Sequence, residues 1–471
     1  MLFTGYDIRG IFKKDLTLEI IYNVVQQFFK KLKIKKALLA VDFNKNNWLI
    51  KKFLEKNFPF EFLGILPTPI FYYEVIKRKK PGIMITASHL PLKYSGLKFI
   101  LENGEPWKPT KLPELNDRIK YPNKRPNKNL EFGQDSGSSF GPYSGNKNIF
   151  GQNSGKRIFN NYFNHLKKII KPKKKIYVNF DKKNFFLSSS LSYFQKLKIY
   201  DIDSVYPNDA RIKYPNKGPN KNLKFGKNSG GKFGQYSGRL SLIKIKSDFD
   251  NDRIFVFVKK PFNGPRQSAL SLRKSAPRLY KIHNDLIFYF LAKLPQYQRL
   301  GVPIFFSQKL KNELLKIGKK IYFVPTGHYF FKKAFKKYKL DLAFEPSGHF
   351  YMFKDLKTEG PYLALGLFLH LIADLYGSNA DKRGLKDFLN LNSSLQLYRF
   401  DINLDLRRVE KIVSFLQKKF KLKLKKFDGY SLHNQDFYLH LRKSKTENKI
   451  RVYYEGSKKY LKEIKKWLMK I

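Results

Sequence analysis

Short apolar runs of strand length alternate with longer amphipathic stretches through most of this chain. Strand-like runs occupy residues 36–43, 83–85, 175–180, 254–258 and 320–324, and helix-like stretches occupy residues 18–32, 191–197, 283–294, 308–317 and 361–376. This alternation predicts α/β layers with largely parallel strand pairing. We expect the last helix to end at Gly377, a residue type that commonly caps helices. Because 471 residues are too many for one hydrophobic core, the chain is expected to form two to four domains.

The pattern changes beyond about residue 391. A helix-like stretch at residues 406–420 is followed by strand-like segments and a C-terminal helix. This change indicates a separate final domain.

Two nearly identical segments interrupt the alternation. Residues 118–133 read RIKYPNKRPNKNLEFG, and residues 211–226 read RIKYPNKGPNKNLKFG. The neighbouring sequence does not repeat, so the segments are not a duplicated domain. Their Pro, Asn, Gly, Ser and Lys content is typical of exposed loops. We interpret them as two copies of an inserted element; the alternative is a pair of basic tails that bind a polyanion.

The chain carries 94 Lys and Arg residues against 37 Asp and Glu residues, a formal net charge of +57. Such an excess attracts nucleic acid or an anionic membrane. The Lys residues are spread along the whole chain, and Phe, Ile, Asn and Tyr are also abundant. Drift of the coding sequence toward A and T therefore explains the charge better than a selected nucleic-acid surface.

Cysteine is absent, which excludes disulfides, thiolate nucleophiles and Cys-ligated zinc. Asp7 and Arg9 lie where a signal peptide needs its apolar centre. The longest apolar stretch, residues 363–376, is broken by His370 and Asp374 and is too short to span a bilayer. We therefore expect a cytoplasmic protein with no membrane partner, either a monomer or a dimer.

Three carboxylates lie close together in this acid-poor chain, between two strand-like runs. Asp248, Asp250 and Asp252 alternate with other residues and are followed by Arg253. Carboxylate oxygens from such a short loop can converge on a hard cation such as Mg²⁺. The alternative is a solvated turn.

Two further polar segments could bind a phosphorylated sugar. The turn EPSGH at residues 345–349 offers Glu and Ser to sugar hydroxyls and a His that can move a proton near neutral pH. The loop RKSKT at residues 442–446 groups cations with hydroxyls, an arrangement that can hold a phosphate by charge-assisted hydrogen bonds.

Ser88 follows the strand-like run at residues 83–85, in the sequence ITASHLPLKYSG. At the N-terminus of a helix its side chain would meet backbone N–H groups that favour an attached anion. The GxSxG motif of many hydrolases is absent around it. Phosphoryl transfer through Ser88, with Mg²⁺ held by the Asp loop, fits these segments together; an ordinary loop serine is the alternative.

In combination and order, six segments resemble the bacterial phosphomannomutase/phosphoglucomutase branch of the α-D-phosphohexomutase superfamily. They are YDIRG (6–10), TASHLPLKYSGLK (86–98), DFDNDR (248–253), PTGH (325–328) with Lys332, EPSGH (345–349), and LRKSKT (441–446) with Arg451.

The resemblance implies an α/β fold of three related mixed α/β domains and a smaller C-terminal α+β domain around a central active-site cleft. The expected domains are 1–172, with an inserted loop at about 117–156; 173–297, with an inserted loop at about 210–239; 298–390; and 391–471. In order, the first domain would carry the phosphoserine loop, and the others would bind the metal, the sugar and the second phosphate.

The implied activity is interconversion of hexose 6-phosphate and hexose 1-phosphate, of mannose or glucose, through a phosphoserine and a hexose 1,6-bisphosphate intermediate. The cofactors would be Mg²⁺ and this bisphosphate, and the partners would be small sugar phosphates. The implied metal ligands are Ser88, Asp248, Asp250 and Asp252. The implied catalytic residues are Ser88, His89, Arg9, Lys98, Arg253, His349 and His328. The implied substrate-binding residues are Tyr6, Lys332, Glu345, Ser347, Arg442, Ser444, Thr446 and Arg451.

The chain departs from the family pattern at several positions. Leu90 stands in place of Asn, Phe249 and Phe344 in place of Gly, and Lys445 in place of Asn. Three alternatives therefore stay open: a phosphoglucosamine mutase, a folded but catalytically impaired relative, and a basic nucleic-acid-binding protein.

Overall fold

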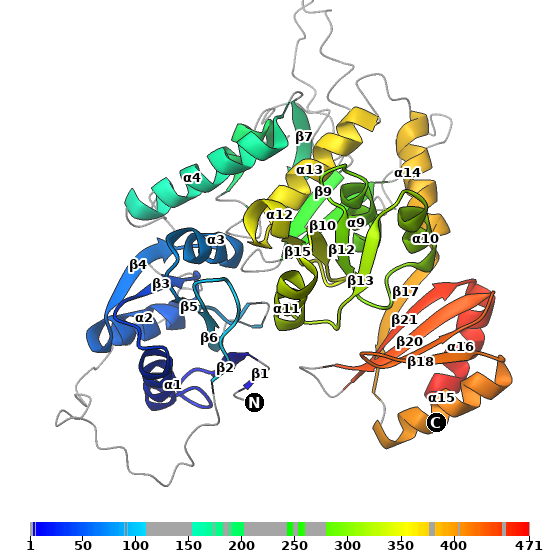
Figure 1. Cartoon of the computed structure of the whole chain (residues 1–471), viewed down its shortest axis with the longest axis horizontal. Coiled ribbons are helices and arrows are strands. Elements are labelled where there is room, and N and C mark those ends of the chain that lie inside the picture. The colour runs from blue at the N-terminus through cyan, green and yellow to red at the C-terminus, as the bar shows by residue number, and fades with distance from the viewer. Residues whose placement is uncertain are drawn as a thin grey trace, which may run out of the picture. The chain divides into compact units, whose positions relative to one another are not determined.

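The computed structural model describes residues 3–4, 6–88, 90–91, 93–109, 153–172, 175–181, 187, 190–201, 243–247, 253–259, 279–375, 382–403, 406–444 and 449–470. They divide into two compact units (Figure 1). One comprises residues 1–66 and 74–158, and the other comprises residues 67–73 and 159–471. Both copies of the repeated segment, and Gly377, lie outside the described residues. The four expected domain boundaries stay a prediction.

The first sheet, drawn in blue in Figure 1, lies in the N-terminal unit. Its strands are β1 (Phe3–Thr4), β2 (Asp7–Ile11), β3 (Ala37–Val41), β4 (Phe60–Ile65), β5 (Gly82–Ile85) and β6 (Tyr94–Ile100). The helices of this stretch are α1 (Leu18–Lys31), α2 (Lys45–Asn57) and α3 (Thr68–Arg78), followed by α4 (Asn153–Ile170). Helix α2 contacts α1 and packs on β3, β5 and β6.

The second and third sheets lie in the other unit. The second contains β7 (Ile176–Phe180), β8 (Ile199–Asp201), β9 (Ile243–Ser247), β10 (Ile254–Lys259) and β11 (Leu279–Lys281), with α6 (Leu191–Phe194) and the 3₁₀-helix η1 (Gln195–Leu197). The third contains β12 (Arg299–Val302), β13 (Lys320–Phe323), β14 (Leu342–Phe344), β15 (Phe350–Met352) and β16 (Thr358–Glu359). Its helices are α9 (Asn284–Ala292), α10 (Gln308–Lys316), α11 (His328–Tyr338), α12 (Phe353–Leu356) and α13 (Pro361–Leu375).

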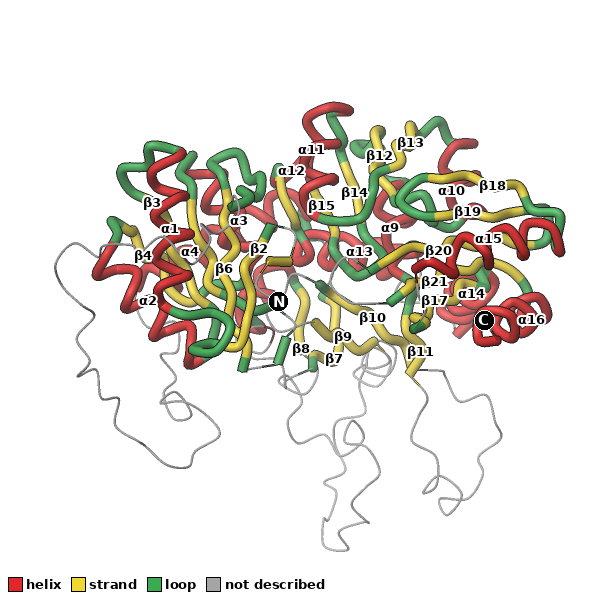
Figure 2. The backbone as a smooth tube through the Cα atoms, turned by 90° about the horizontal axis from the view of Figure 1, so that it is seen from below, coloured by secondary structure: helices red, strands yellow, loops and turns green. Residues whose placement is uncertain are grey.

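These three sheets share one strand arrangement. In each, the first strand of the series lies between the second and third and is parallel to both: β3 between β4 and β5, β7 between β8 and β9, and β12 between β13 and β14. The next strand then pairs with the third in the antiparallel sense, as β6, β10 and β15 do. Figure 2 shows β7, β9 and β10 side by side. The expected mixed α/β fold class is confirmed.

The expectation of largely parallel pairing is wrong, because each sheet is mixed. Three strands of each are parallel, and the remaining strands are antiparallel. Parallel strands need a long crossover, whereas an antiparallel partner can come after a short connection. A short apolar run has the same pattern in a parallel and in an antiparallel strand, so the sequence pattern did not distinguish parallel from antiparallel pairing.

The fourth sheet is antiparallel throughout, in the order β17 (Leu397–Ile402), β21 (Ile450–Gly456), β20 (Phe437–Lys443), β19 (Tyr430–His433) and β18 (Lys423–Lys426). Helix α14 (Lys382–Ser394) precedes it, and α15 (Leu406–Lys419) and α16 (Lys458–Lys470) complete the region. Its core combines buried residues of α15 and α16 with those of the strands, among them Ile412, Leu416, Leu439 and Ile464. The change of pattern near residue 391 therefore reflects a real change of topology.

The helices expected from apolar periodicity begin and end within two residues of the expected positions, except that residues 191–197 divide into α6 and η1. Helix α1 shows why the agreement is close. Its N-cap Thr17 accepts a hydrogen bond from the backbone N–H of Ile20, and Lys30 and Lys31 lie in its last turn, where cations are favoured. No helix in the described ranges is long and apolar enough to cross a membrane.

A carboxylate of the fourth sheet caps a helix of the third. Glu455 on β21 accepts hydrogen bonds from Ser307 Oγ at 2.9 Å and from the backbone N–H groups of Gln308 at 2.6 Å and Lys309 at 3.3 Å. A carboxylate at a helix N-terminus satisfies free N–H groups and interacts favourably with the helix dipole. This contact fixes β21 against helix α10.

Asp285 on α9 forms a second link between these two sheets. Its side chain is fully buried, pairs with Arg399 of β17 and accepts the backbone N–H of Ser307 at 3.1 Å. A buried charge is tolerated only when it is paired and hydrogen-bonded. The sheet that carries LRKSKT is thus tied to the sheet that carries EPSGH.

We expect Asp285→Ala to lower the free energy of unfolding by about 3 kcal/mol or more, because Arg399 loses its carboxylate partner in a buried setting. Chemical denaturation of the full chain measures this change. Lys316→Ala is the control: it removes an exposed pair with Glu313, which solvent screens, and should leave the same quantity nearly unchanged. Equal losses in the two variants would contradict the proposed role of Asp285.

Candidate active site

Three of the chemically distinctive motifs occupy the same position in three sheets. Residues 86–93 connect β5 to β6, residues 248–253 connect β9 to β10, and residues 345–349 connect β14 to β15. Each connection comes after the third parallel strand, at the carboxyl edge of the parallel set, where ligands bind in open α/β sheets. The segments that contain Ser88, the three Asp residues and Glu345 therefore connect equivalent strands of the three sheets.

Ser88 is held in a strained turn just beyond β5. Its φ of +56° lies in the left-handed region, its side chain is buried, and its N–H donates to Thr86 Oγ1 at 2.9 Å. Such strain at a non-glycine residue is concentrated at functional sites. The helix start that the sequence left possible at Ser88 is not found, because no described residue between β5 and β6 is helical. The backbone reverses directly into β6 instead.

Two cations predicted for the Ser88 loop lie on the neighbouring antiparallel strands. Arg9 on β2 donates from Nη2 to Asp7 at 2.7 Å and from Nη1 to the carbonyl oxygen of Ala87 at 3.5 Å, next to Ser88. Lys98 on β6 is buried. Gly96, opposite Arg9, is needed because a Cβ there would lie 2.7 Å from the carbonyl oxygen of Ile8. Both cations lie on the antiparallel half of this sheet.

Several predicted residues fall outside the described part of the chain. They are His89, Asp248, Asp250, Asp252 and Thr446, as well as the substituted positions Phe249 and Lys445. Their roles stay predictions. The ends of the Asp loop are described: Ser247 of β9 pairs with Ile254 of β10, so the three carboxylates belong to a connection between paired strands.

The EPSGH turn closes on itself. The N–H of Glu345 donates to the carbonyl oxygen of His349 at 2.9 Å, and the N–H of Gly348 donates to that of Glu345 at 2.9 Å. Gly348 has a φ of +110°, a region that L side chains rarely adopt. The Glu345 carboxylate accepts the N–H of Gly327 at 2.6 Å and the hydroxyl of Tyr351 at 2.8 Å, which fixes its direction.

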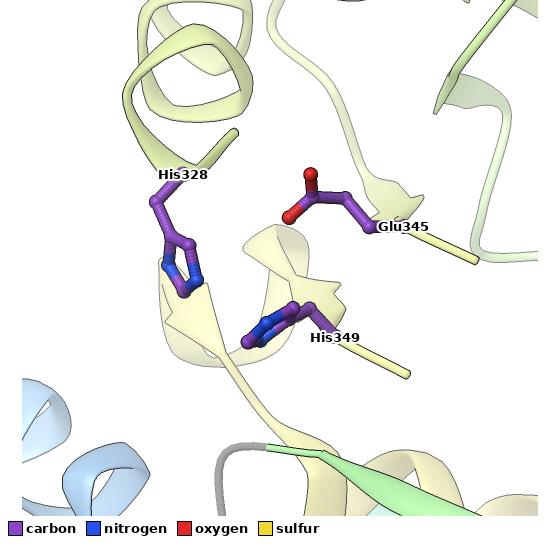
Figure 3. Close-up of side chains that lie close together, drawn as sticks. All are labelled: His328, Glu345 and His349. Atoms are coloured by element: carbon purple, nitrogen blue, oxygen red, sulfur yellow. The ribbon is translucent and has the colours of Figure 1, made fainter. Parts of the chain in front are cut away.

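Glu345, His349 and His328 point toward one another (Figure 3). Their carboxylate oxygen and ring nitrogen atoms lie within 4.8 Å of one another. The two imidazole rings meet edge to face, with their centroids 4.4 Å apart. These atom types could hold a metal ion. Arg253 argues against a cation here, because its Nε donates to His349 Nε2 at 3.0 Å and occupies that lone pair. The group is better suited to hydrogen bonding than to holding a metal ion.

Arg442, Ser444 and Arg451 form a cationic and hydroxylic patch on the fourth sheet. Arg442 and Arg451 are direct cross-strand partners on β20 and β21, an arrangement that is unfavourable unless an anion lies nearby. Arg442 Nε and Ser444 Oγ are buried and have no hydrogen-bond partner among the described residues. Arg451 and Ser347 both line a cavity of about 380 Å³. The patch has the donors and the charge that a phosphate needs.

Asp428 joins this patch to the start of helix α11, a contact that the sequence analysis missed. It accepts hydrogen bonds from the N–H of Thr326 at 2.9 Å, from Thr326 Oγ1 at 2.7 Å and from Arg442 Nη1 at 3.2 Å. Asp428 and Gly429 both have positive φ and look in sequence like an ordinary hairpin turn. Thr326, close to His328 in the PTGH segment, is thereby linked to the phosphate patch.

Glu359 is the second residue that the sequence analysis missed. It lies on β16, is 1% exposed, and contacts both His328 and Lys332. Asp355, Lys357 and Thr358 just before it are polar, so nothing in the sequence indicated that this carboxylate is buried.

The substitution Phe344 is accommodated in the core. Its ring stacks on that of Phe288 of α9, with the centroids 4.5 Å apart, and is fully buried. The side chain therefore faces the core. Leu90 is partly exposed, and its N–H donates to the carbonyl oxygen of Ala87 at 3.3 Å.

Two family models match the chain. Residues 1–125 match phosphoglucomutase/phosphomannomutase alpha/beta/alpha domain I, and residues 285–386 match alpha/beta/alpha domain III. A phosphomannomutase of Methanocaldococcus jannaschii is 26% identical and aligns with 100% of this chain and 98% of its own. The chain belongs to the α-D-phosphohexomutase superfamily.

Other members of the superfamily agree with this assignment. A phosphoglucosamine mutase of Prochlorococcus marinus is 34% identical over 21% of this chain and 23% of its own. The structure of a phosphoglucomutase/phosphomannomutase family protein from Burkholderia thailandensis has a TM-score of 0.65 at 16% identity and covers 100% of this chain and 96% of its own. The family, the fold and the general function as a hexose-phosphate mutase expected from the sequence are confirmed.

The strand that carries Arg442 is held by a buried histidine. His440 donates from Nε2 to the carbonyl oxygen of Asp428 at 3.1 Å, so its Nδ1 accepts from Ser431 Oγ at 2.8 Å, and its ring stacks on Phe305 at 4.9 Å. Burial lowers the pKa of His440 to about 4. The imidazole is therefore neutral in the folded protein at neutral pH.

We expect this histidine to make stability depend on pH between 6.5 and about 4. In that window unfolded His440 binds a proton that the folded residue does not, so the free energy of unfolding falls as pH falls, by up to about 3 kcal/mol. His440→Gln should remove this part of the dependence. Unfolding curves of both proteins across the window measure it, and equal slopes would contradict the prediction.

Proposed function

We propose that the chain interconverts hexose 6-phosphate and hexose 1-phosphate through a phosphoryl group carried on Ser88 and a hexose 1,6-bisphosphate intermediate. The observation that carries the proposal is the setting of Ser88: a buried serine at φ +56° beyond the third parallel strand, inside the segment that matches family domain I. Arg9, Lys98 and His89 are the proposed partners of the phosphoryl group. Cations favour the charge that spreads over its oxygens during transfer.

Mg²⁺ is the proposed cofactor, held by Asp248, Asp250 and Asp252 together with the phosphoryl oxygen on Ser88. The donor set fits, because three carboxylate oxygens from one connection between paired strands match the hard-oxygen preference of Mg²⁺. When bound, Mg²⁺ supplies electrostatic stabilisation of the transferring phosphoryl group. Arg253, the next residue after the Asp loop, is oriented by His349.

Glu345 and Ser347 are the proposed ligands of two sugar hydroxyls, with Tyr6 and Lys332 as further substrate contacts. Both Glu345 oxygens are anchored by protein donors, which leaves their remaining lone pairs in a fixed direction. Arg442, Ser444, Thr446 and Arg451 would hold the phosphate that does not react. The unpartnered Arg442 Nε and Ser444 Oγ support this assignment.

Mannose and glucose phosphates are the proposed substrates, and glucosamine phosphate is the alternative. One relative that aligns along the whole chain is named a phosphomannomutase, whereas several that align over about a quarter of it are named phosphoglucosamine mutases. Parallel assays with mannose 1-phosphate, glucose 1-phosphate and glucosamine 6-phosphate, each with Mg²⁺ and a bisphosphate primer, distinguish them. Conversion of none of the three would favour the catalytically impaired relative.

We expect the protein to carry the mass of one phosphoryl group after incubation with a hexose 1,6-bisphosphate, and Ser88→Ala to lose both this mass and the mutase activity. Intact-mass spectrometry and a coupled assay measure the two. Ser95→Ala is the matched control, since Ser95 is a buried serine of β6 and should keep both. A phosphoryl group that persists in Ser88→Ala would overturn the assignment.

The basic nucleic-acid-binding alternative makes a different prediction. Binding driven by the +57 charge alone weakens steeply with salt and ignores sequence. A preference for one nucleic-acid sequence or structure at 200 mM salt, roughly the range where nonspecific contacts weaken, would favour that alternative.

A further inference from the structure

Asp428 lies in the turn between β18 and β19, and its φ of +49° is in the left-handed region. The turn is held from both sides. The N–H of Phe427 donates to the carbonyl oxygen of Gly429 at 3.0 Å, and Nε2 of His440 donates to the carbonyl oxygen of Asp428 at 3.1 Å. Because these bonds fix the backbone of the turn, the Asp428 carboxylate starts from a fixed position.

The turn packs directly against the strand that carries Arg442. Gly429 has a φ of +126°, and a Cβ there would overlap the carbonyl oxygen of Leu441 and lie 2.8 Å from Cβ of Arg442. Glycine is therefore required at this position for steric reasons as well as for its φ. The close approach brings the Asp428 side chain to the guanidinium of Arg442.

One oxygen of Asp428 accepts three hydrogen bonds. Oδ2 accepts from the N–H of Thr326 at 2.9 Å, from Thr326 Oγ1 at 2.7 Å and from Arg442 Nη1 at 3.2 Å. Thr326 and Arg442 are 6% and 7% exposed, so these bonds are shielded from water. Since the donors share one oxygen, the position of Arg442 depends on that of Thr326 in the PTGH segment.

The contact uses one corner of the Arg442 guanidinium. The N–H groups of Nε and Nη2 point the same way and form the edge that can bind two oxygens of a carboxylate or phosphate at once. Nη1, which Asp428 holds, is not part of this edge. Nε is buried and has no hydrogen-bond partner in the part of the chain that the structure describes. Asp428 therefore orients the guanidinium without using the edge that binds anions best.

Ser444 and Arg451 add further donors to the same patch. Ser444 is two residues after Arg442, and its buried Oγ has no hydrogen-bond partner among the described side chains and backbone. Arg451 is the direct cross-strand partner of Arg442. Buried donors without acceptors and facing like charges are both unfavourable, and the oxygens of a phosphate would relieve both.

We propose that Asp428 is a positioning residue: by holding Nη1 of Arg442 against Thr326, it presents the Nε–Nη2 edge of Arg442 to the phosphate that does not react. The inference rests on the proposed function for the identity of this phosphate. It does not depend on turnover, because a sugar phosphate that binds without reacting is held in the same way.

Charge and position predict opposite effects of Asp428 on binding. The carboxylate is an anion beside an anion-binding patch, so if it acted through its charge alone, its removal would strengthen phosphate binding. If it orients Arg442, its removal weakens phosphate binding. The sign of the change therefore distinguishes the two roles.

Isothermal titration calorimetry of the full chain with glucose 6-phosphate and mannose 6-phosphate, with Mg²⁺ and without a bisphosphate primer, measures this sign. Asp428→Asn removes the charge and keeps a residue type that tolerates positive φ. We expect its Kd to rise by about fivefold or more, because a charge-assisted hydrogen bond becomes a weaker neutral one. An unchanged or lower Kd would overturn the proposal.

Asp436→Asn is the matched control. Asp436 is an exposed carboxylate in another turn of the same sheet, so the substitution makes the same change of charge. We expect its Kd to stay within about twofold of the wild type, since an exposed charge is screened by solvent. Thermal unfolding followed by circular dichroism gives the folded fraction of each variant, and a merely structural role of Asp428 would leave Kd per folded molecule unchanged.

A double-mutant cycle tests whether Asp428 acts through Arg442. Arg442→Lys keeps the charge but removes the two-donor edge. In that background Asp428→Asn should weaken binding by less than about twofold, because the group that it positions is already gone. A further loss as large as in the wild-type background would reject Arg442 as the residue through which Asp428 acts.

The outcomes separate this inference from the proposed function. A wild type that binds a hexose 6-phosphate without converting it, with weaker binding in Asp428→Asn, would reject the proposed function and leave the role of Asp428 intact. Mutase turnover with an unchanged Kd in Asp428→Asn would reject the positioning role alone. A wild type that binds neither sugar phosphate would overturn both.

Discussion

The reversal of chain direction after the third parallel strand is the constraint on which the candidate site depends. Parallel strands end on one edge of their sheet, and an antiparallel fourth strand must start from that same edge. The connection between them is therefore short, and its ends are fixed by strand pairing. The chain uses this position three times, for the loops that contain Ser88, the three Asp residues and Glu345. In the EPSGH turn, hydrogen bonds within the loop add to this anchoring by the strands.

A few carboxylates hold the third and fourth sheets and their loops together. In a chain with a net charge of +57, Asp285, Glu359, Asp428 and Glu455 each accept hydrogen bonds from two or more donors. Asp285, Asp428 and Glu455 join the fourth sheet to the third, and Glu359 holds residues within the third. A buried anion is stable only when several donors surround it, so each of these residues fixes the position of all its partners at once.

Much of the local structure was predictable. Apolar periodicity placed helix α1 and strand β5 almost to the residue, because their burial matches the period of the element. Three expectations needed correction or addition. Ser88 is in a turn rather than at a helix start, since the direction of the chain beyond β5 is set by the strand with which β5 pairs. The pairing is mixed rather than largely parallel. Phe344, which stands where the family pattern has Gly, packs into the core.

The sequence by itself determined the chemistry: the order and spacing of YDIRG, TASH, DFDNDR, PTGH, EPSGH and LRKSKT, which was enough to identify the superfamily. Only the tertiary structure decided which of these groups can act and how. Glu359 and Asp428 have no motif of their own, and they meet His328, Thr326 and Arg442 through pairings between residues that are 14 to 102 positions apart. Such pairings arise from strand order and helix packing, which short-range patterns do not encode. The contacts of His328 and of Arg442 are therefore properties of the folded chain.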